Sequence, residues 1–132
     1  MITAVDSSVL LDVLTDDPEY ADASEEALRR ARQEGAMVLC ETVLAEITPV
    51  LPPGEMENLL RDWELAFVPS SMKSALLAGN LLRQYLERGG KKGRVVADFL
   101  IGAHAQTSAG RLLTRDRGFY RDYFQQLEIW NP

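Results

Sequence analysis

RVVADFLIGAHAQTSAGRLLTRDRGFYRDYF, residues 94–124, is the stretch of this chain that decides its fold. From Val95 to Ala109, apolar residues lie on nearly every side of a helical projection, which is typical of a buried helix. One carboxylate, Asp98, falls in the first turn, and a buried charge is costly unless a partner compensates it. Residues 111–114 then predict a short strand, and Asp116 follows at once in a turn. Ligands bind at the carboxyl ends of strands in open α/β sheets, so we expect these two acids to approach one site.

Strand and helix patterns alternate along the whole chain. Short apolar segments typical of buried strands lie at Ile2–Val5, Ala36–Cys40, within Trp63–Val68, and at Arg111–Thr114 and Leu127–Trp130. Helix patterns lie at Ser8–Thr15, Glu19–Glu34, Glu41–Val50, Glu55–Asp62, from Ser70 or Ser71 to about Arg88, at Val95–Ala109 and at Phe119–Phe124. Strands separated by helices predict a single α/β domain over residues 1–132, with a mostly parallel sheet covered on both faces.

The composition is that of an ordinary soluble globular domain. The chain has 132 residues, of which 46% are hydrophobic and 26% are charged. Cys40 is the only cysteine, which excludes a disulfide framework and a cysteine-based zinc site. No basic segment precedes an apolar run at the N-terminus, and no run reaches the roughly 20 residues that span a bilayer. We therefore expect a cytoplasmic protein that has no contact with a membrane.

The charges are unevenly distributed. Residues 1–64 hold 15 acids and 4 bases, whereas residues 65–132 hold 5 acids and 10 bases, for a net charge of −6. Five bases flank the acids of the opening stretch: Lys91, Lys92 and Arg94 in a glycine-rich loop, and Arg115 and Arg117 beside Asp116. A basic rim around an acidic centre suits a polyanion that is held by its phosphates near a metal. The alternative is that these bases belong to solvated surface.

Four acids stand where an acid is unfavourable. Asp6 ends the first predicted strand, Glu46 is the only charge in the apolar segment 42–51, and Asp98 and Asp116 were described above. If the first and fourth strands are neighbours, Asp6 and Asp116 end together. Carboxylates about 5 Å apart repel by roughly 3 kcal/mol at an effective dielectric near 20, so a cation is needed to hold such a group. Donors that are all oxygen suit Mg²⁺, with Mn²⁺ as a substitute.

Each acid also has an ordinary structural explanation. Asp6 is able to cap the following helix, Glu46 to face solvent, Asp116 to stabilise its turn, and Asp98 to complement the helix dipole. His104 is the only histidine, which excludes a ribonuclease with paired histidines and favours a structural role for this residue. It is the order of the four acids, and the elements that carry them, that favour a shared site.

The same ordered set of acids resembles the PIN-domain family, and especially the VapC-type toxins of toxin–antitoxin pairs. The matching segments are ITAVDSSVLLDVL at 2–14, VLAEI at 43–47, VVADFLIGAHA at 95–105, LLTRDRGFYRDYF at 112–124 and LEIWNP at 127–132. The resemblance covers essentially the whole chain. It implies a three-layer α/β/α sandwich and a Mg²⁺-dependent endoribonuclease that hydrolyses RNA with a metal-activated water.

Carried over by motif, the resemblance implies that Asp6, Glu46, Asp98 and Asp116 bind the metal and act in catalysis. Ser7 and Thr114 match hydroxyl positions that line such sites. Many relatives carry a further acid two or three residues after the last one, where this chain has Gly118 and Phe119, so the ligands of a second metal stay undefined.

The resemblance further implies two protein partners. One is a cognate antitoxin, whose C-terminal segment would cover the acidic groove. The other is a second copy of the chain, held through the apolar faces of the terminal helix and of the Leu76–Leu86 helix. The alternative function is a catalytically silent PIN-like module that binds RNA or protein.

Overall fold

A five-stranded sheet with strand order β3-β2-β1-β4-β5 forms the centre of the molecule. The computed structural model describes every residue except Lys92, Arg94 and Arg117. The strands are β1 (Thr3–Val5), β2 (Met37–Leu39), β3 (Leu65–Phe67), β4 (Arg111–Leu113) and β5 (Glu128–Trp130). The helices are α1 (Ser7–Leu14), α2 (Ala21–Glu34), α3 (Glu41–Ile47), the 3₁₀ helix η1 (Thr48–Val50), α4 (Met56–Asp62), α5 (Met72–Glu87), α6 (Val95–Ser108) and α7 (Phe119–Tyr123).

All four strand pairings are parallel, which confirms the predicted α/β/α fold with its parallel sheet. Every residue of β1, β2 and β4 is buried, as expected for strands that are covered on both faces. The first and fourth strands are neighbours, with Val5 opposite Leu113, so the condition for Asp6 and Asp116 to end together is met. The residues that follow these strands, Asp6 and Thr114, therefore leave the sheet side by side.

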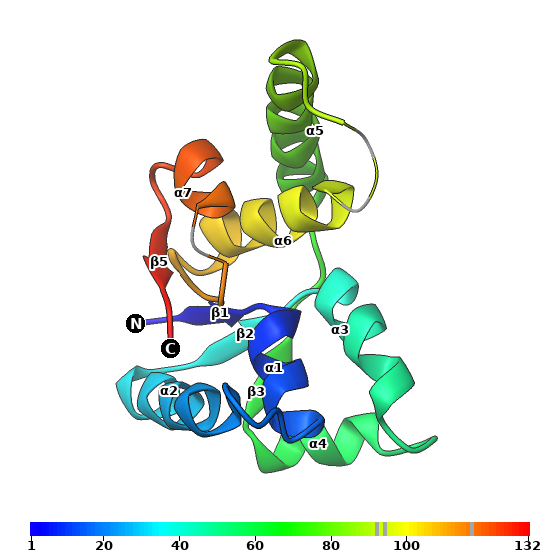
Figure 1. The fold of residues 1–132 in the computed structure, drawn as a ribbon, viewed down its shortest axis with the longest axis vertical. Helices are drawn as coiled ribbons and strands as arrows, with labels where there is room; N and C mark the ends of the chain where they lie inside the picture. Colours follow the sequence, from blue (N-terminus) through cyan, green and yellow to red (C-terminus); the bar gives the residue numbers. More distant parts are fainter. Residues whose placement is uncertain (92, 94, 117) are drawn as a thin grey trace.

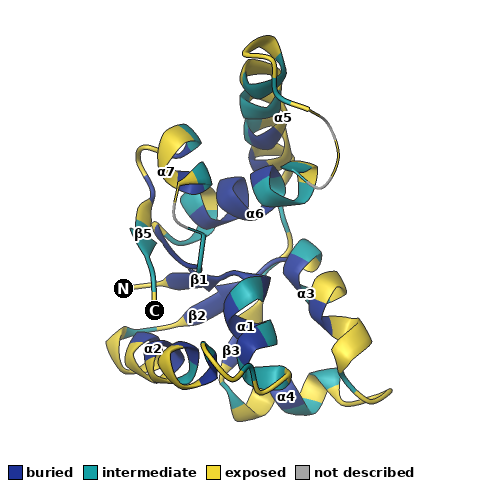
Figure 2. Ribbon diagram, in the orientation of Figure 1, coloured by how far each residue is buried: buried dark blue, intermediate teal, exposed yellow. Residues whose placement is uncertain are grey.

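Figure 1 shows α5, α6 and α7 gathered at one end of the molecule and α1, α2 and α4 at the other, with α5 extending beyond the rest. Figure 2 shows that burial is concentrated in the sheet and in the inner part of α6, while the outer faces of α2 and α5 are exposed. Among the residues that the structure describes, no helix is both long enough and apolar enough to cross a membrane.

Two helix boundaries differ from the prediction by more than one residue, and both differences have local reasons. The helix expected over Glu41–Val50 ends at Ile47 and continues as a 3₁₀ turn, because Pro49 has no N–H for the α-helical hydrogen bond. The α2 helix begins at Ala21 instead of Glu19. Before it, the Asp17 carboxylate accepts hydrogen bonds of 2.9 Å from the N–H groups of Glu19 and Tyr20, which holds this segment in a turn.

The buried helix predicted from the opening stretch is α6, and it contains one glycine for a steric reason. A Cβ atom at Gly102 would collide with the ring of Phe124, which follows α7. Phe124 is itself buried, at 1% exposure. Glycine at this position therefore allows the segment after α7 to pack directly against α6.

His104, the only histidine of the chain, has a structural role, as the sequence favoured. The side chain is 1% exposed, and its Nε2 lies 2.7 Å from the carbonyl oxygen of Val68, just after β3. Burial lowers the pKa of His104, although the hydrogen bond to Val68 and the charge of Glu41 act in the opposite direction. The neutral imidazole therefore donates its Nε2 proton to the carbonyl and ties α6 to the edge of the sheet.

This lowered pKa predicts a pH-dependent stability. Below about pH 6.5 the unfolded chain binds a proton at His104 that the folded chain does not bind, so the free energy of unfolding should fall as pH decreases. The loss from this residue is at most about 1.4 kcal/mol per pH unit. Urea unfolding at pH 7.5 and 5.5 should show a smaller pH-dependent loss for His104→Gln than for the natural chain. Equal losses would mean that His104 binds protons to the same extent in the folded and the unfolded chain, so that folding does not lower its pKa.

Candidate metal centre

Asp6 occupies the N-cap position of α1, but its carboxylate does not cap the helix backbone. Its Oδ2 accepts hydrogen bonds of 2.8 Å from the hydroxyls of Ser8 and Thr114. The residue is 7% exposed. Asp6 therefore stands at the N-cap position, but its side chain is directed to the hydroxyls of Ser8 and Thr114 and not to the helix backbone.

Thr114 connects the two acids that follow β1 and β4. Its hydroxyl donates to Asp6 and accepts a hydrogen bond of 3.1 Å from the N–H of Asp116. The Asp116 carboxylate in turn accepts from the N–H of Tyr120 at 3.1 Å, at the start of α7. From the end of β5, the amide of Asn131 donates to the carbonyls of Thr114 and Asp116, at 2.6 and 2.8 Å. The Asp116 turn is therefore held from both sides.

Glu46 and Asp98 approach from helices. Glu46 lies near the end of α3 and is exposed, and its Oε1 accepts a hydrogen bond of 2.9 Å from the hydroxyl of Ser7. Asp98 lies in the first turn of α6 and is half-buried. The predicted hydroxyls thus each donate to one of the four carboxylates, Ser7 to Glu46 and Thr114 to Asp6.

One side chain lies within electrostatic range of all four acids. Burial raises the pKa of the Tyr120 hydroxyl far above its ordinary value. The negative charges of the acids raise it further, in the order Asp6, Asp98, Asp116 and Glu46. All four predicted acids thus contribute to the raised pKa of one buried hydroxyl, although they are spread over 111 residues of sequence from Asp6 to Asp116.

The donor set fits a hard divalent cation in its chemistry. All four side chains offer oxygen, which Mg²⁺ prefers. Within the described residues, the hydrogen-bond partners of Asp6, Glu46 and Asp116 are neutral hydroxyl or N–H groups, so their charges are not cancelled by those contacts. In the same part of the chain, no three acidic, histidine or cysteine side chains are already arranged around a common point as metal ligands. A cation would have to draw the carboxylates closer together.

The family model for the PIN domain matches residues 3–124. This chain belongs to the PIN-domain family. A comparison with curated protein sequences finds no match.

The fold of this PIN domain is similar to that of chains in several solved toxin–antitoxin structures. VapBC2 from Rickettsia felis, bound to a promoter DNA fragment, matches with a TM-score of 0.75 and 19% identity, covering 100% of this chain and 99% of that chain. DNA-bound VapBC from Salmonella typhimurium matches with a TM-score of 0.69 and 14% identity, covering 99% and 98%. VapBC-5 from Mycobacterium tuberculosis matches with a TM-score of 0.61 and 19% identity, also covering 99% and 98%. These likenesses extend over the whole PIN domain.

The predicted phosphate-binding residues of the PIN domain have different surroundings. Lys91 is exposed, and its carbonyl accepts a hydrogen bond of 3.1 Å from the hydroxyl of Tyr85. Arg115 is turned to another acid: its Nε lies 2.6 Å from Asp12, and its guanidinium stacks over the Tyr20 ring at 4.1 Å. The other three predicted residues, Lys92, Arg94 and Arg117, lie outside the described residues.

Asp12 and Tyr120 were not predicted as special positions. The Asp12 side chain is 2% exposed and accepts a second hydrogen bond, of 2.7 Å, from Ser24. Asp12 interrupts the apolar run LLDVL much as Glu46 interrupts its own segment, and that signal was available in the sequence. For Tyr120 the aromatic spacing of 119–124 predicts packing, and it contains no information on where the hydroxyl points.

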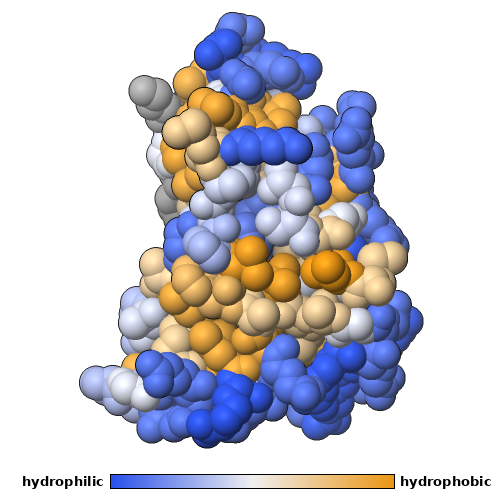
Figure 3. All heavy atoms as spheres, turned by 180° about the vertical axis from the view of Figure 1, so that it is seen from behind, coloured by the Kyte–Doolittle hydropathy of each residue, from blue (hydrophilic) through white to orange (hydrophobic). Residues whose placement is uncertain are grey.

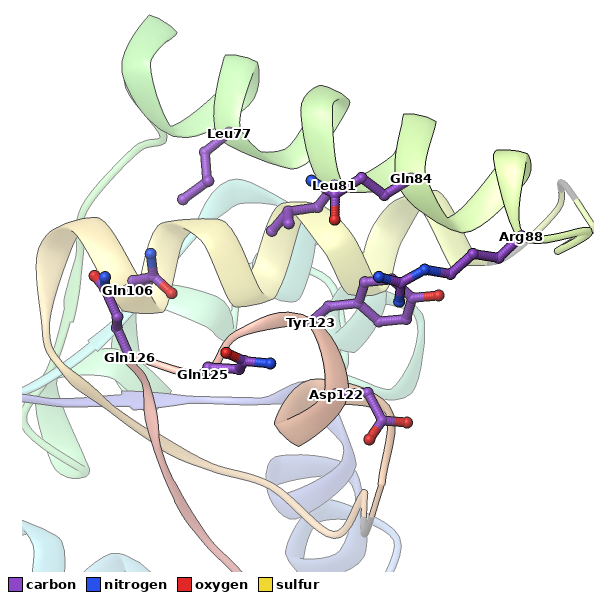
Figure 4. A pocket seen from close by; sticks show the side chains of 9 residues that line it. All are labelled: Leu77, Leu81, Gln84, Arg88, Gln106, Asp122, Tyr123, Gln125 and Gln126. Atoms are coloured by element: carbon purple, nitrogen blue, oxygen red, sulfur yellow. The ribbon is translucent and has the colours of Figure 1, made fainter.

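A separate pocket of about 280 Å³ lies between α5, α6 and the segment that follows α7 (Figure 4). Leu77 and Leu81 of α5 and Gln106 of α6 line it, and the Arg88 guanidinium lies over the Tyr123 ring at 5.5 Å. None of the four acids lines this pocket. It is therefore a feature of the helical end of the PIN domain and not the candidate metal centre.

The contact between Arg115 and Asp12 predicts a structural role that is measurable by unfolding. Arg115→Gln should lower the free energy of unfolding by about 1–3 kcal/mol, because a buried carboxylate loses its ion pair while the arginine itself is one-third exposed. Asp12→Asn combined with Arg115→Gln should recover part of the loss in urea unfolding. Arg83→Gln, at an exposed position of α5, is the matched control. Unchanged stability together with weaker RNA binding would instead assign Arg115 to the phosphates.

Proposed function

We propose that this PIN domain is a Mg²⁺-dependent endoribonuclease that acts as the toxin of a toxin–antitoxin pair, with Mn²⁺ as a substitute metal. One observation carries the proposal: the Thr114 hydroxyl links the two strand-end acids, donating to the Asp6 carboxylate and accepting from the N–H of Asp116. All four predicted acids also contribute to the raised pKa of the buried Tyr120 hydroxyl. Four carboxylates lie within electrostatic range of this hydroxyl, and three of them, Asp6, Glu46 and Asp116, accept hydrogen bonds from neutral donors among the described residues. A divalent cation would stabilise such a group of acids. Membership of the PIN family over residues 3–124 supports the same activity.

In the proposed site, Asp6, Asp98 and Asp116 hold the cation, and Glu46 completes the set or orients the attacking water. A bound Mg²⁺ would supply charge neutralisation at the phosphodiester and a more acidic water. Thr114 orients Asp6, and Ser7 orients Glu46, through the hydroxyl contacts described above. In this proposal the protein supplies the carboxylates, and the bound cation would offset their repulsion of the negatively charged phosphate.

RNA is the proposed substrate because basic residues flank Asp98 and Asp116 in the sequence. Lys91 is exposed on the loop before α6 and is available for a phosphate. Lys92, Arg94 and Arg117 are proposed for the same role from the sequence, and Arg115 would contribute only what its pairing with Asp12 leaves free. The binding energy of such contacts is mostly electrostatic and should decrease with salt.

A cognate antitoxin is the proposed protein partner, and the cytoplasm the proposed location. The support is the likeness in fold to chains of VapBC assemblies from three bacteria. A basic antitoxin side chain placed among the four carboxylates would satisfy them in place of the cation. Such a contact would explain inhibition by charge alone.

The nuclease is tested with purified, antitoxin-free protein and a pool of structured RNAs that includes transfer RNAs. Discrete products should form with Mg²⁺ or Mn²⁺ and disappear with EDTA. Asp98→Asn should reduce the cleavage rate more than about 100-fold, because even the loss of a group that only orients a metal ligand typically costs 10- to 100-fold. Asp122→Asn, at an exposed position of α7, is the matched control and should cleave as the natural chain does.

Cleavage that survives both EDTA and Asp98→Asn would remove the metal mechanism and the site assignment together. If no product forms, Mg²⁺ titration by calorimetry decides between two explanations. Binding that Asp98→Asn abolishes would leave a nuclease whose substrate is missing from the pool. The absence of binding would favour the second candidate, a catalytically silent PIN-like module.

A homodimer is proposed from the apolar surface of the molecule. On α5, Met72 is 79% exposed and Leu76 is 61% exposed, and Val96 on α6 is 39% exposed. Figure 3 shows apolar side chains in a broad band across one face of the molecule, bordered below by hydrophilic ones. Extended apolar surface of this kind is typical of protein interfaces.

Leu76→Glu should therefore convert a dimer into a monomer, because a charge would be buried against the partner. Size-exclusion chromatography with light scattering measures the mass directly, and circular dichroism checks the fold. Val50→Glu alters another exposed apolar residue, on η1, and should leave the dimer intact. A monomeric natural chain, or a dimeric Leu76→Glu variant, would contradict the proposed interface.

A further inference from the structure

The hydroxyl of Tyr120 is buried without a hydrogen-bond partner among the described residues. The residue is only 2% exposed. A buried hydroxyl that has lost water and gained no protein partner destabilises the folded state. Such a group in a native protein therefore requires an explanation.

The position of the Tyr120 ring is set by its surroundings. Its backbone N–H donates to the Asp116 carboxylate, which places the residue in the first turn of α7 beside the proposed metal ligand. The rings of Phe119 and Phe124 lie 5.4 and 6.1 Å from the Tyr120 ring, centroid to centroid. The ring is thus packed in place, and the negative charges of the four acids raise the pKa of the hydroxyl at its end.

The Tyr120 hydroxyl is better suited to donate a hydrogen bond to a carboxylate than to bind the metal itself. A phenol hydroxyl is able to donate a hydrogen bond, and carboxylate oxygens are hydrogen-bond acceptors. Without a cation the carboxylates repel one another, and their oxygens have no reason to converge on the phenol. A cation that gathers the carboxylates would bring an acceptor to this donor.

We propose that Tyr120 is a positioning residue of the metal centre, whose hydroxyl donates a hydrogen bond to a carboxylate that holds the divalent cation. This inference rests on the proposed function, since it requires that the four acids bind a metal. It assigns to Tyr120 the role of an orienting partner, which fixes the direction of the carboxylate and does not touch the substrate. It also gives the unpartnered hydroxyl its partner in the metal-bound protein.

The test is a comparison of Tyr120→Phe with Tyr123→Phe, a matched loss of a hydroxyl on the same helix from a half-buried residue that lines the separate pocket. Calorimetric titration with Mn²⁺ should show an affinity about tenfold weaker for Tyr120→Phe and unchanged for Tyr123→Phe. Thermal unfolding provides a second readout. In EDTA, Tyr120→Phe should be at least as stable as the natural chain, because an unpaired hydroxyl has been removed. In Mn²⁺ its gain in melting temperature should be smaller.

Each outcome decides the proposal. Equal Mn²⁺ affinity of Tyr120→Phe and the natural chain, with binding still abolished in Asp98→Asn, overturns the role of Tyr120 and leaves the proposed metal site standing. A Tyr120→Phe variant that is less stable in EDTA would show that the hydroxyl has a structural partner without metal, and this also overturns the inference. A natural chain that binds no Mn²⁺ would remove the inference and the proposed function together.

Discussion

The parallel pairing of β1 with β4 is the constraint on which the rest of the candidate site depends. It places the first residues after the two strands next to each other, so that the Thr114 hydroxyl reaches Asp6 over a separation of 108 residues in sequence. The same hydroxyl receives the N–H of Asp116, and Asn131 holds the turn from the end of β5. A displaced register would separate the two strand-end acids, because everything that orients them is attached to the sheet.

The acidic side chains have two kinds of hydrogen-bond partner, charged and neutral. Asp12 is buried and forms an ion pair with Arg115, so the protein itself compensates its charge. The defined partners of Asp6, Glu46 and Asp116 among the described residues are instead hydroxyl and N–H groups, which orient a carboxylate without cancelling its charge. An uncompensated group of acids is unfavourable in an isolated fold and favourable for a site whose ligand is positive. This difference separates a structural acid from a functional candidate better than burial does.

The helix α6 couples the candidate site to the core. Its first turn carries Asp98, Gly102 allows close packing of Phe124, and His104 bonds to Val68 beyond β3. The aromatic rings around Phe99 connect this helix to α5 and α7, with the Phe119 ring 4.9 Å from that of Phe99. Asp98 is therefore positioned by a helix that is anchored along its length, and the position of Tyr120 depends on the same packing. A rigid support of this kind is what a site needs when its own charges repel.

The sequence by itself determined the alternation of strands and helices, the parallel sheet and the elements that carry the four acids, because these depend on local periodicity and on interruptions of apolar runs. The adjacency of β1 and β4 was only a condition in the sequence, and the tertiary structure decided it. Helix ends were less accurate where a short-range contact decided them, as at Pro49 and Asp17. Only the tertiary structure decided that Arg115 pairs with Asp12, 103 residues away, and that all four acids act electrostatically on the Tyr120 hydroxyl. The direction of a side chain depends on which surfaces pack together, and no periodicity in the chain specifies that choice.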